Sequence, residues 1–173
     1  TAGSTTNNTT ATFGFASSTS GVTYECRVDG TVSNYAPCTS AFTTPALGNG
    51  SHTFYVRAKN NVNTYSAETS RQWTIDTTPP ATPTLTRTAP TSTPTNTTTA
   101  TLTAGSVESG ATLQYTTNGG TTWTNAPGNT NPIQLTGLTN GTTYNYAVRV
   151  LDAATNASAS SNTVSWTVDT SPP

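Results

Sequence analysis

Two cysteines carry the most distinctive chemistry in this chain of 173 residues. Cys26 and Cys38 are the only ones, and they are twelve residues apart. That spacing spans a strand, a turn and a returning strand, which can bring two Cα atoms within disulfide range. In a related second half of the chain, described below, the aligned positions hold Tyr115 and Gly128, so both cysteines are lost together. We expect a disulfide, which indicates an oxidising compartment such as a periplasm or the cell exterior. Free or catalytic thiols and a metal site are the alternatives.

The single histidine, His52, limits the other chemistry that the chain can perform. One histidine rules out a His-based metal cluster within the chain. A Ser-His-Asp triad would need His52 as its base, but the sequence has no nucleophile elbow and no Gly-rich oxyanion loop. His52 aligns with Tyr144, at a position where sandwich domains hold a buried ring whose polar tip bonds to the backbone. We therefore expect a structural role for His52, no catalytic residue and no enzyme activity.

The seven acidic residues are scattered along the chain. Asp76 lies near the middle, where the first half joins the second, and it is the calcium candidate. Calcium takes about six to eight oxygen ligands, several of them from carboxylates, and only one acid lies at this joint. We expect no cofactor and no metal, with calcium at Asp76 as the alternative.

Three aromatic residues are candidates for contact with a ligand: Tyr35, Tyr65 and Trp123. Aromatic side chains stack on sugars and anchor protein interfaces. The competing interpretation is that these rings cover the core or the edge of a sandwich. If a ligand-facing patch exists, we expect it in the loops over residues 30–38 and 60–68.

The composition excludes several partners. Charged residues make up only 8% of the chain and the formal net charge is −1, so without basic clusters we expect no nucleic acid as a partner. No apolar stretch approaches the length of a transmembrane helix, so we expect no membrane insertion. No window shows apolar residues at helical spacing, whereas threonine, the commonest residue, suits the solvated faces of strands.

The chain contains an internal repeat. The segment Trp73–Pro80 recurs as Trp166–Pro173 after about ninety residues, the length of one small β-sandwich. Only small length changes, all in loops, are needed to align the two halves. We expect two domains, residues 1–78 with one disulfide and residues 79–173, the second ending in a further inter-domain linker.

Strands follow from alternating apolar residues bounded by Gly, Asn and Pro. The clearest alternation places Tyr144, Tyr146, Val148 and Val150 on one face. Its counterpart in the first half turns the side chains at 52, 54, 56 and 58 inward and those at 55, 57 and 59 outward. The expected strands of the first domain are 10–16, 22–29, 39–46, 51–59 and 69–76. Those of the second are 82–88, 98–105, 111–118, 121–124, 132–136, 142–151 and 162–169. The fold class expected is all-β, with two tandem immunoglobulin-like or fibronectin type III-like sandwiches.

Several segments resemble the bacterial Ig-like repeats of large surface proteins and adhesins, and are also similar to fibronectin type III modules. They are Tyr24–Gly30, Pro37–Ser40, Leu47–Phe54 and Trp73–Asp76, with Leu113–Tyr115 and Gly119–Trp123 in the second half. The resemblance covers nearly the whole chain. It implies an extracellular or cell-surface location, neighbouring repeats in a longer chain, and a glycan or protein on another cell or surface as the partner.

The proline-rich joint over residues 77–83 indicates a mechanical role. Proline fixes φ and favours extended geometry, which makes the joint a semi-rigid spacer and predicts an elongated arrangement of the two domains. The function expected is a non-catalytic spacer or stalk of a bacterial adhesin or surface fibre. The alternatives are a glycan- or protein-binding tip module, and an accessory module of a secreted polysaccharide-degrading enzyme or phage tail protein.

Overall fold

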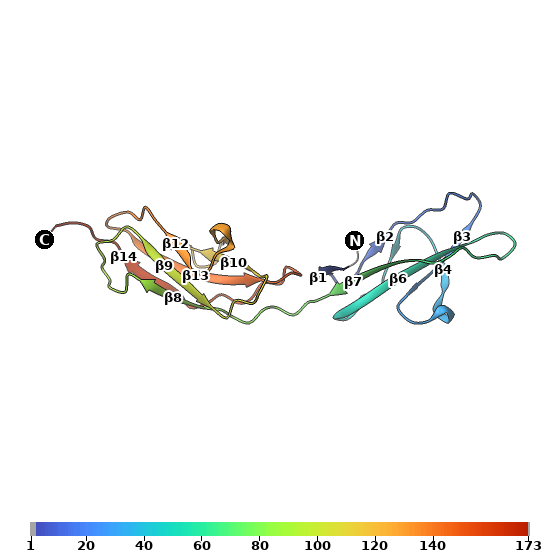
Figure 1. The fold of residues 1–173 in the computed structure, drawn as a ribbon, viewed down its shortest axis with the longest axis horizontal. Coiled ribbons are helices and arrows are strands. Elements are labelled where there is room, and N and C mark those ends of the chain that lie inside the picture. The colour runs from blue at the N-terminus through green and yellow to red at the C-terminus, as the bar shows by residue number, and fades with distance from the viewer. Residues whose placement is uncertain (1–2, 173) are drawn as a thin grey trace. The chain divides into compact units, whose positions relative to one another are not determined.

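The computed structural model describes residues 3–172, and the chain in it divides into two compact units after Thr78. Both units are built from β-strands, and the only helical turns in the described residues are two short 3-10 helices, Val32–Asn34 and Pro127–Asn129. Figure 1 shows the strands of each unit along the chain. Unit 1 denotes the part up to Thr78 and unit 2 the part from Pro79. The all-β fold class expected from the sequence is confirmed.

Unit 1 has one large sheet and one small sheet. The large sheet has the strand order β1-β7-β6-β3-β4, and the small one pairs β2 with β5. The strands are β1 (Ser4–Thr6), β2 (Thr12–Phe13), β3 (Thr23–Val28), β4 (Ala36–Cys38), β5 (Phe42–Thr43), β6 (Gly50–Lys59) and β7 (Thr69–Ile75). β1 runs parallel to β7 and covers only its last three residues, 73–75.

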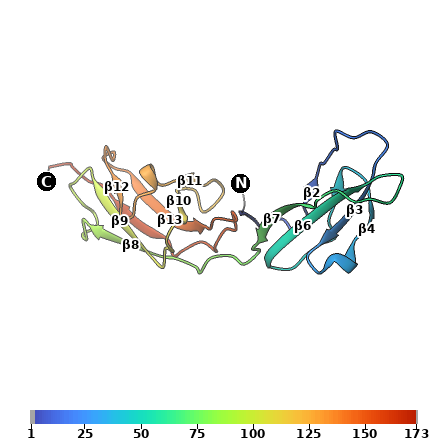
Figure 2. The same cartoon turned by 45° about the vertical axis from the view of Figure 1, so that its right-hand side comes forward.

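Unit 2 divides its strands more evenly between two sheets, of order β11-β10-β13-β14 and β12-β9-β8. Figure 2 shows these layers from a second angle. The strands are β8 (Thr84–Ala89), β9 (Ala100–Gly105), β10 (Thr112–Thr116), β11 (Thr124–Asn125), β12 (Ile133–Leu135), β13 (Thr143–Leu151) and β14 (Val164–Thr167).

The cores of the two units differ in size. In unit 2, fourteen buried residues form one cluster around Trp166, with Leu102, Ile133, Val148 and Val150 fully enclosed. In unit 1 the corresponding cluster has four buried residues, namely Cys26, Phe54, Trp73 and Ile75. The aromatic rings around it are only partly buried. Unit 1 therefore has much less buried apolar surface to stabilise it.

Most expected strands are present, but the expected bounds are wrong at several places. The strands expected at 10–16 and 39–46 shrink to the two-residue strands β2 and β5, because the sheet they form has no third strand. β4 was not expected, since a three-residue strand that contains Pro37 has no alternation to detect. The expected strands of the first domain begin at residue 10, and the structure has a further edge strand before it, β1. The strand expected at 121–124 lies later, at β11.

Candidate functional site

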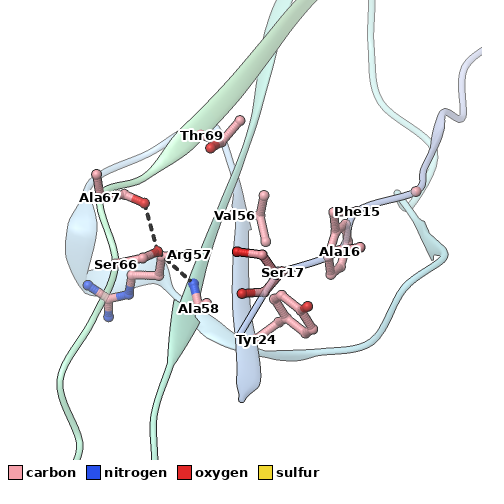
Figure 3. A pocket seen from close by; sticks show the side chains of 12 residues that line it. Phe15, Ala16, Ser17, Tyr24, Val56, Arg57, Ala58, Ser66, Ala67 and Thr69 are labelled. Carbon is pink, nitrogen blue, oxygen red and sulfur yellow. Dashed lines mark hydrogen bonds between the residues drawn. The ribbon is translucent and has the colours of Figure 1, made fainter. Parts of the chain in front are cut away.

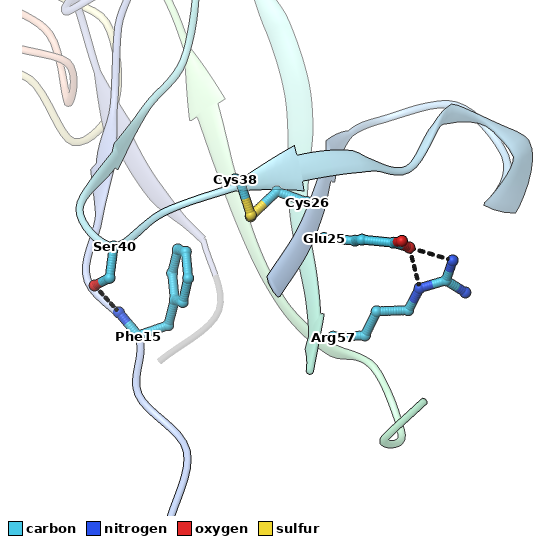
Figure 4. Close-up of a disulfide and its surroundings, with 6 residues drawn as sticks. All are labelled: Phe15, Glu25, Cys26, Cys38, Ser40 and Arg57. Atoms are coloured by element: carbon cyan, nitrogen blue, oxygen red, sulfur yellow. Dashed lines mark hydrogen bonds and ion pairs between the residues drawn. A yellow bond between two sulfur atoms is a disulfide. The ribbon is translucent and has the colours of Figure 1, made fainter. Parts of the chain in front are cut away.

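The disulfide lies on the inner face of the large sheet of unit 1 (Figure 4). Cys26 on β3 and Cys38 on β4 are bonded, with their Cα atoms 5.8 Å apart. Cys26 is also one of the four buried core residues. No free cysteine is present, so the bond closes the β3–β4 hairpin and leaves no thiol for chemistry.

His52 joins two loops of unit 1 through its two ring nitrogens. Its Nε2 lies 2.9 Å from the carbonyl oxygen of Gly48, and its Nδ1 lies 2.7 Å from a carboxylate oxygen of Asp29. In unit 2 the hydroxyl of Tyr144 accepts a hydrogen bond of 2.8 Å from the amide of Thr139, the counterpart of Gly48. Each ring therefore bonds the backbone at the same turn, which is the structural role expected for His52.

Because Gly48 offers only an acceptor, the Nε2 of His52 must carry a proton to bond it, and Nδ1 must carry a second proton to donate to Asp29. The hydrogen bond to Asp29 is the main cause that raises the pKa of His52, and the bond to Gly48 adds to it. Burial alone would raise the pKa of Asp29, but hydrogen bonds from His52 and the Thr53 amide lower it. The pair is an ion pair that is most stable when both groups are charged.

Asp76 lies where the chain leaves unit 1, and there it is part of a hydrogen-bonded turn. Its carboxylate accepts a hydrogen bond of 2.9 Å from the amide of Thr78. Asn49 reaches across from the turn before β6, accepts bonds from the amide and hydroxyl of Thr77, and donates to the hydroxyl of Thr78. We call this arrangement the exit clasp.

Unit 2 ends in the same clasp. Asp169 accepts a bond of 3.0 Å from the amide of Ser171, and Asn140 accepts one of 2.8 Å from the amide of Thr170. Asn140 is the residue that aligns with Asn49. Within residues 3–172, no three His, Cys, Asp or Glu side chains come together as a metal site would require. The structure therefore adds no ligand cluster to support calcium at Asp76.

The outer face of the large sheet of unit 1 carries a ladder of alternating aromatic and arginine side chains. Arg57 on β6 lies between two rings, with its guanidinium carbon 3.8 Å from the centroid of Tyr65 and 4.1 Å from that of Tyr35. Arg27 on β3 lies 3.4 Å from the centroid of Tyr55 and 5.2 Å from that of Tyr35. The order is Tyr55, Arg27, Tyr35, Arg57, Tyr65, which we call the outer ladder.

Strand register explains why these side chains meet. β3 and β6 pair so that Arg27 lies opposite Tyr55 and Glu25 lies opposite Arg57, all on the face away from Cys26. The two remaining rings come from the loops on either side. Cation–π contacts of this kind are strongest where the guanidinium is shielded from water, and only 6% of the Arg27 side chain is exposed.

Two carboxylates balance the arginines of the outer ladder. Glu25 accepts hydrogen bonds from Arg57, 3.1 Å from Nε and 2.6 Å from Nη2 (Figure 4). The bond from Arg57 is the main cause that lowers the pKa of Glu25. Glu68 lies 3.4 Å from Arg27 and accepts a bond of 2.9 Å from the hydroxyl of Tyr35. Burial, and then this bond to Glu68, raise the pKa of Tyr35. Each arginine of the ladder thus has a carboxylate partner, and Lys59, which lies 4.0 Å from Glu25 and 5.6 Å from the ring centroid of Tyr65, adds one further positive charge to this face.

The structure thus brings Tyr35 and Tyr65 together from the two loops that the sequence indicated. The large apolar side chains exposed within residues 3–172 lie in the same two loops: Val32, Val62 and Tyr65, at 67%, 72% and 41% exposure. Arg27 was not expected at the site. The signal that could have found it is its place two residues after Glu25, on the outward side of the same strand.

Trp123 belongs to a shorter version of the ladder in unit 2. The guanidinium carbon of Arg149 lies 4.5 Å from the centroid of Trp123, and its Nε donates a bond of 2.7 Å to Gln114. Arg149 aligns with Arg57 and Gln114 with Glu25, so unit 2 has the same side-chain pair with a neutral amide in place of the carboxylate. Trp123 is only half-buried.

A cavity of about 470 Å³ lies in unit 1 between residues 14–18 and strands β6 and β7 (Figure 3). Phe15, Tyr24 and Val56 supply its apolar surface, and Ser66 and Thr69 supply hydroxyls. Ser66 is itself engaged, since its hydroxyl accepts from the amide of Ala58 and donates to the carbonyl of Ala67. Its lining contains no acid, histidine or thiol, and Arg57 is the charged residue in it.

Comparison with known proteins identifies the fold. No protein-family model matches the chain, and a search of curated proteins finds no significant match. The chain is similar to the fibronectin(III)-like modules of CbhA from Clostridium thermocellum, with a TM-score of 0.52, 14% identity, and coverage of 97% of this chain and 89% of that one. It is also similar to a chain in the crystal structure of the mouse coronavirus receptor-binding domain complexed with its murine receptor. There the TM-score is 0.57 and the identity 11%, and the match covers 96% of this chain and 95% of that one. These likenesses show a fibronectin(III)-like or Ig-like fold. No helix in the described residues is long and apolar enough to cross a membrane.

Proposed function

We propose that the chain is a non-catalytic spacer built from two fibronectin(III)-like modules in tandem, part of the stalk of a bacterial adhesin or surface fibre. The observation that carries this proposal is the exit clasp, which recurs at the end of both units. By holding the departing chain against its own module, the clasp would set the direction in which the next module follows. Neither a binding site nor a catalytic group requires it.

Two prolines directly follow the residues that the clasp holds. Asn49 holds residues 77 and 78 through three hydrogen bonds, and Pro79 and Pro80 follow at once. Proline fixes φ near −65° and favours extended backbone, so it leaves few ways for the chain to turn. We infer that the joint is semi-rigid and the two units are arranged end to end.

The disulfide and the fibronectin(III)-like fold are consistent with an extracellular location. The cell surface of a bacterium is the finer proposal. An accessory module of a secreted polysaccharide-degrading enzyme or phage tail protein would have the same fold and disulfide. The parent reading frame distinguishes them, since many further repeats indicate a stalk and a catalytic domain indicates an accessory module.

The spacer proposal is tested by the distance distribution between spin labels, one on an exposed strand residue of each unit. Asn49→Ala removes the three hydrogen bonds that Asn49 makes in the clasp at the end of unit 1, and it is expected to broaden the distribution. Asn140→Ala removes the equivalent clasp after unit 2 and serves as the matched control, because it leaves the joint intact. A distribution that is already broad in the unmodified chain would overturn the proposal.

A second candidate function is recognition of a glycan or protein through the outer ladder. It is favoured by the exposed Val32, Val62 and Tyr65, since apolar side chains gathered in neighbouring loops mark interaction sites. A glycan array and a protein-ligand screen with the full chain test it. Binding that is lost with Val62→Ser or Tyr65→Ser but kept with Trp123→Ser would support a site on unit 1. If neither screen detects binding, recognition through the outer ladder is not supported and the spacer role is the remaining proposal.

A further inference from the structure

The turn that carries Asn49 is also bonded by His52. Leu47 is anchored at the start of this turn, because its amide donates a hydrogen bond of 2.9 Å to the carbonyl of Thr9. The backbone is anchored again where β6 begins, in its pairing with β7. Gly48 and Asn49 therefore form a two-residue link between two fixed points of the backbone.

Two side chains hold this link in place. The Nε2 of His52 bonds the carbonyl oxygen of Gly48 at 2.9 Å. Asn49 itself makes the three bonds of the exit clasp to Thr77 and Thr78, at 2.8 to 3.0 Å. Because glycine has a wide choice of backbone conformations, release of the Gly48 carbonyl would allow the link to move, and Asn49 with it.

The His52 ring can make both of its hydrogen bonds only when it carries two protons. Gly48 and Asp29 each offer an acceptor, so both ring nitrogens must donate. A neutral imidazole has one N–H and one bare nitrogen, and a bare nitrogen repels an acceptor. Loss of one proton therefore breaks one of the two bonds.

The bond to Gly48 is the one that is expected to break. The bond to the Asp29 carboxylate is charge-assisted and is the shorter of the two, 2.7 Å against 2.9 Å, and charge-assisted bonds are the stronger kind. Asp29 is also fixed in place, since its other carboxylate oxygen accepts a bond of 2.7 Å from the amide of Thr53 on β6. The remaining proton therefore stays between His52 and Asp29, and the nitrogen that faces Gly48 becomes an acceptor.

The groups around His52 determine the pH at which this happens. The bond to Asp29 is the main cause that raises the pKa of His52, and in the described residues Asp29 is the one ionisable side chain that acts on it. Burial acts to raise the pKa of Asp29, but the bond from His52 and, among weaker causes, the charge of Arg27 on β3 hold it low. From β7, the ring of Trp73 lies 5.7 Å from that of His52 and carries no charge. The ring therefore loses its second proton above the ordinary histidine pKa of about 6.5.

Unit 2 has the same link without a histidine. Leu138 is anchored by a bond of 2.9 Å to the carbonyl of Thr98, and Asn140 bonds the exit segment. The link is bonded by the hydroxyl of Tyr144, which accepts from the amide of Thr139. Histidine is the side chain whose charge ordinarily changes between about pH 5 and pH 8, so of the two described links the one in unit 1 is expected to respond to pH in that range.

We propose that the protonation of His52 controls the exit clasp of unit 1, so that the chain after Asp76 is held firmly when the ring is charged and is released when the ring becomes neutral. This inference rests on the spacer role proposed above, and it adds a pH-dependent control of the same joint. The clasp after unit 2 is expected to be insensitive to pH over the same range.

The test is ¹⁵N NMR relaxation of the full chain, recorded below and above the pH at which the His52 ring titrates, at a temperature where both units stay folded. The order parameters of the Thr77 amide and of the Asn49 side-chain amide are expected to fall on the alkaline side, with the midpoint of the His52 ring resonance. Order parameters are needed because a change of charge alone moves chemical shifts without opening the clasp. The Thr170 amide, bonded by Asn140, is the internal reference and should stay ordered throughout.

Two variants of unit 1 provide the controls. His52→Tyr introduces the residue found in unit 2 and should abolish the pH response of the clasp while leaving it closed. Asp29→Asn removes the carboxylate that raises the pKa of His52, so the midpoints of the ring and of the clasp should move together to lower pH. If the clasp of His52→Tyr opens with an unchanged midpoint, another group controls it and the inference is wrong.

The distance distribution between spin labels on the two units separates this inference from the spacer proposal. A distribution that is narrow below the His52 midpoint and broad above it, together with the loss of order at Thr77, supports both. If Thr77 and Asn49 stay ordered while the His52 ring titrates, control by His52 is overturned and the spacer role stands. A distribution that is broad at both pH values overturns the spacer role, and control of the joint with it.

Discussion

Reduction of the disulfide is expected to unfold unit 1 at a temperature at which unit 2 remains folded. The bond closes a loop of twelve residues, and the chain-entropy estimate for a loop of that length is about 3 kcal/mol. Unit 1 has four buried residues in its core cluster where unit 2 has fourteen, so it has little other stabilisation to absorb that loss. For a domain of this size, 3 kcal/mol corresponds to a fall in melting temperature of about 12–24 °C.

The assay is a thermal titration of the full chain with and without a phosphine reductant, followed by calorimetry and by NMR. The indole resonance of Trp73 reports unit 1 and that of Trp166 reports unit 2, because each ring lies in the core of its own unit. A thiol count verifies complete reduction. The Trp166 signal is expected to melt at an unchanged temperature, since unit 2 has no cysteine. If full reduction leaves the Trp73 transition where it was, the inferred dependence of unit 1 on its disulfide is wrong.

Three further predictions follow from individual contacts. The raised pKa of His52 means that its ion pair with Asp29 stabilises unit 1 fully below the unfolded histidine pKa of about 6.5, and that this contribution is lost as the pH rises through the folded pKa. The lowered pKa of Asp29 means that its contribution is lost as the pH falls through its folded pKa, so the melting temperature of unit 1 should peak between the folded pKa values of Asp29 and His52. His52→Tyr, which introduces the residue found in unit 2, should remove the decline on the alkaline side. A pH profile unchanged by that substitution would contradict the ion pair between His52 and Asp29. Arg57→Met should lower the melting temperature of unit 1 on the order of 5 °C and Arg149→Met that of unit 2 by less, because the first removes two charge-assisted hydrogen bonds to the Glu25 carboxylate and leaves it only Lys59 at 4.0 Å and the Tyr65 hydroxyl at 3.3 Å, whereas the second removes a bond to the neutral Gln114 amide; equal shifts would refute the role of that ion pair. A chelator should leave both transitions unmoved, and a fall in either would revive calcium at Asp76.

The long strands were predictable because alternation is a local signal. The alternation of apolar and polar residues along β6 identifies Phe54 and Val56 as facing the core, and the same alternation along β13 identifies Tyr146, Val148 and Val150. The disulfide was predictable from spacing and from the joint loss of both cysteines in the second half. The short strands β1 and β4 were not, because three residues are too few to show a period.

The outer ladder was predictable only in part. Alternation places Arg57 on the outward face and composition draws attention to Tyr35 and Tyr65. Their meeting depends on how two loops fold back over the sheet, which no local pattern records. Arg27 was missed for the same reason, since an outward arginine is normally solvated and this one is covered by rings from both sides. The exit clasp was also hidden, because an Asn before Gly reads as a turn and its bonds to Thr77 and Thr78 join residues far apart in the sequence.

We propose that the clasped, proline-rich joint makes the two modules move as one spacer. The most direct measurement is ¹⁵N NMR relaxation of the full chain, which gives a rotational correlation time for each unit separately. Both units are expected to share one long, anisotropic correlation time in the unmodified chain and to separate into shorter ones in Asn49→Ala. Units that already tumble independently in the unmodified chain, each with the correlation time of an isolated module, would contradict it.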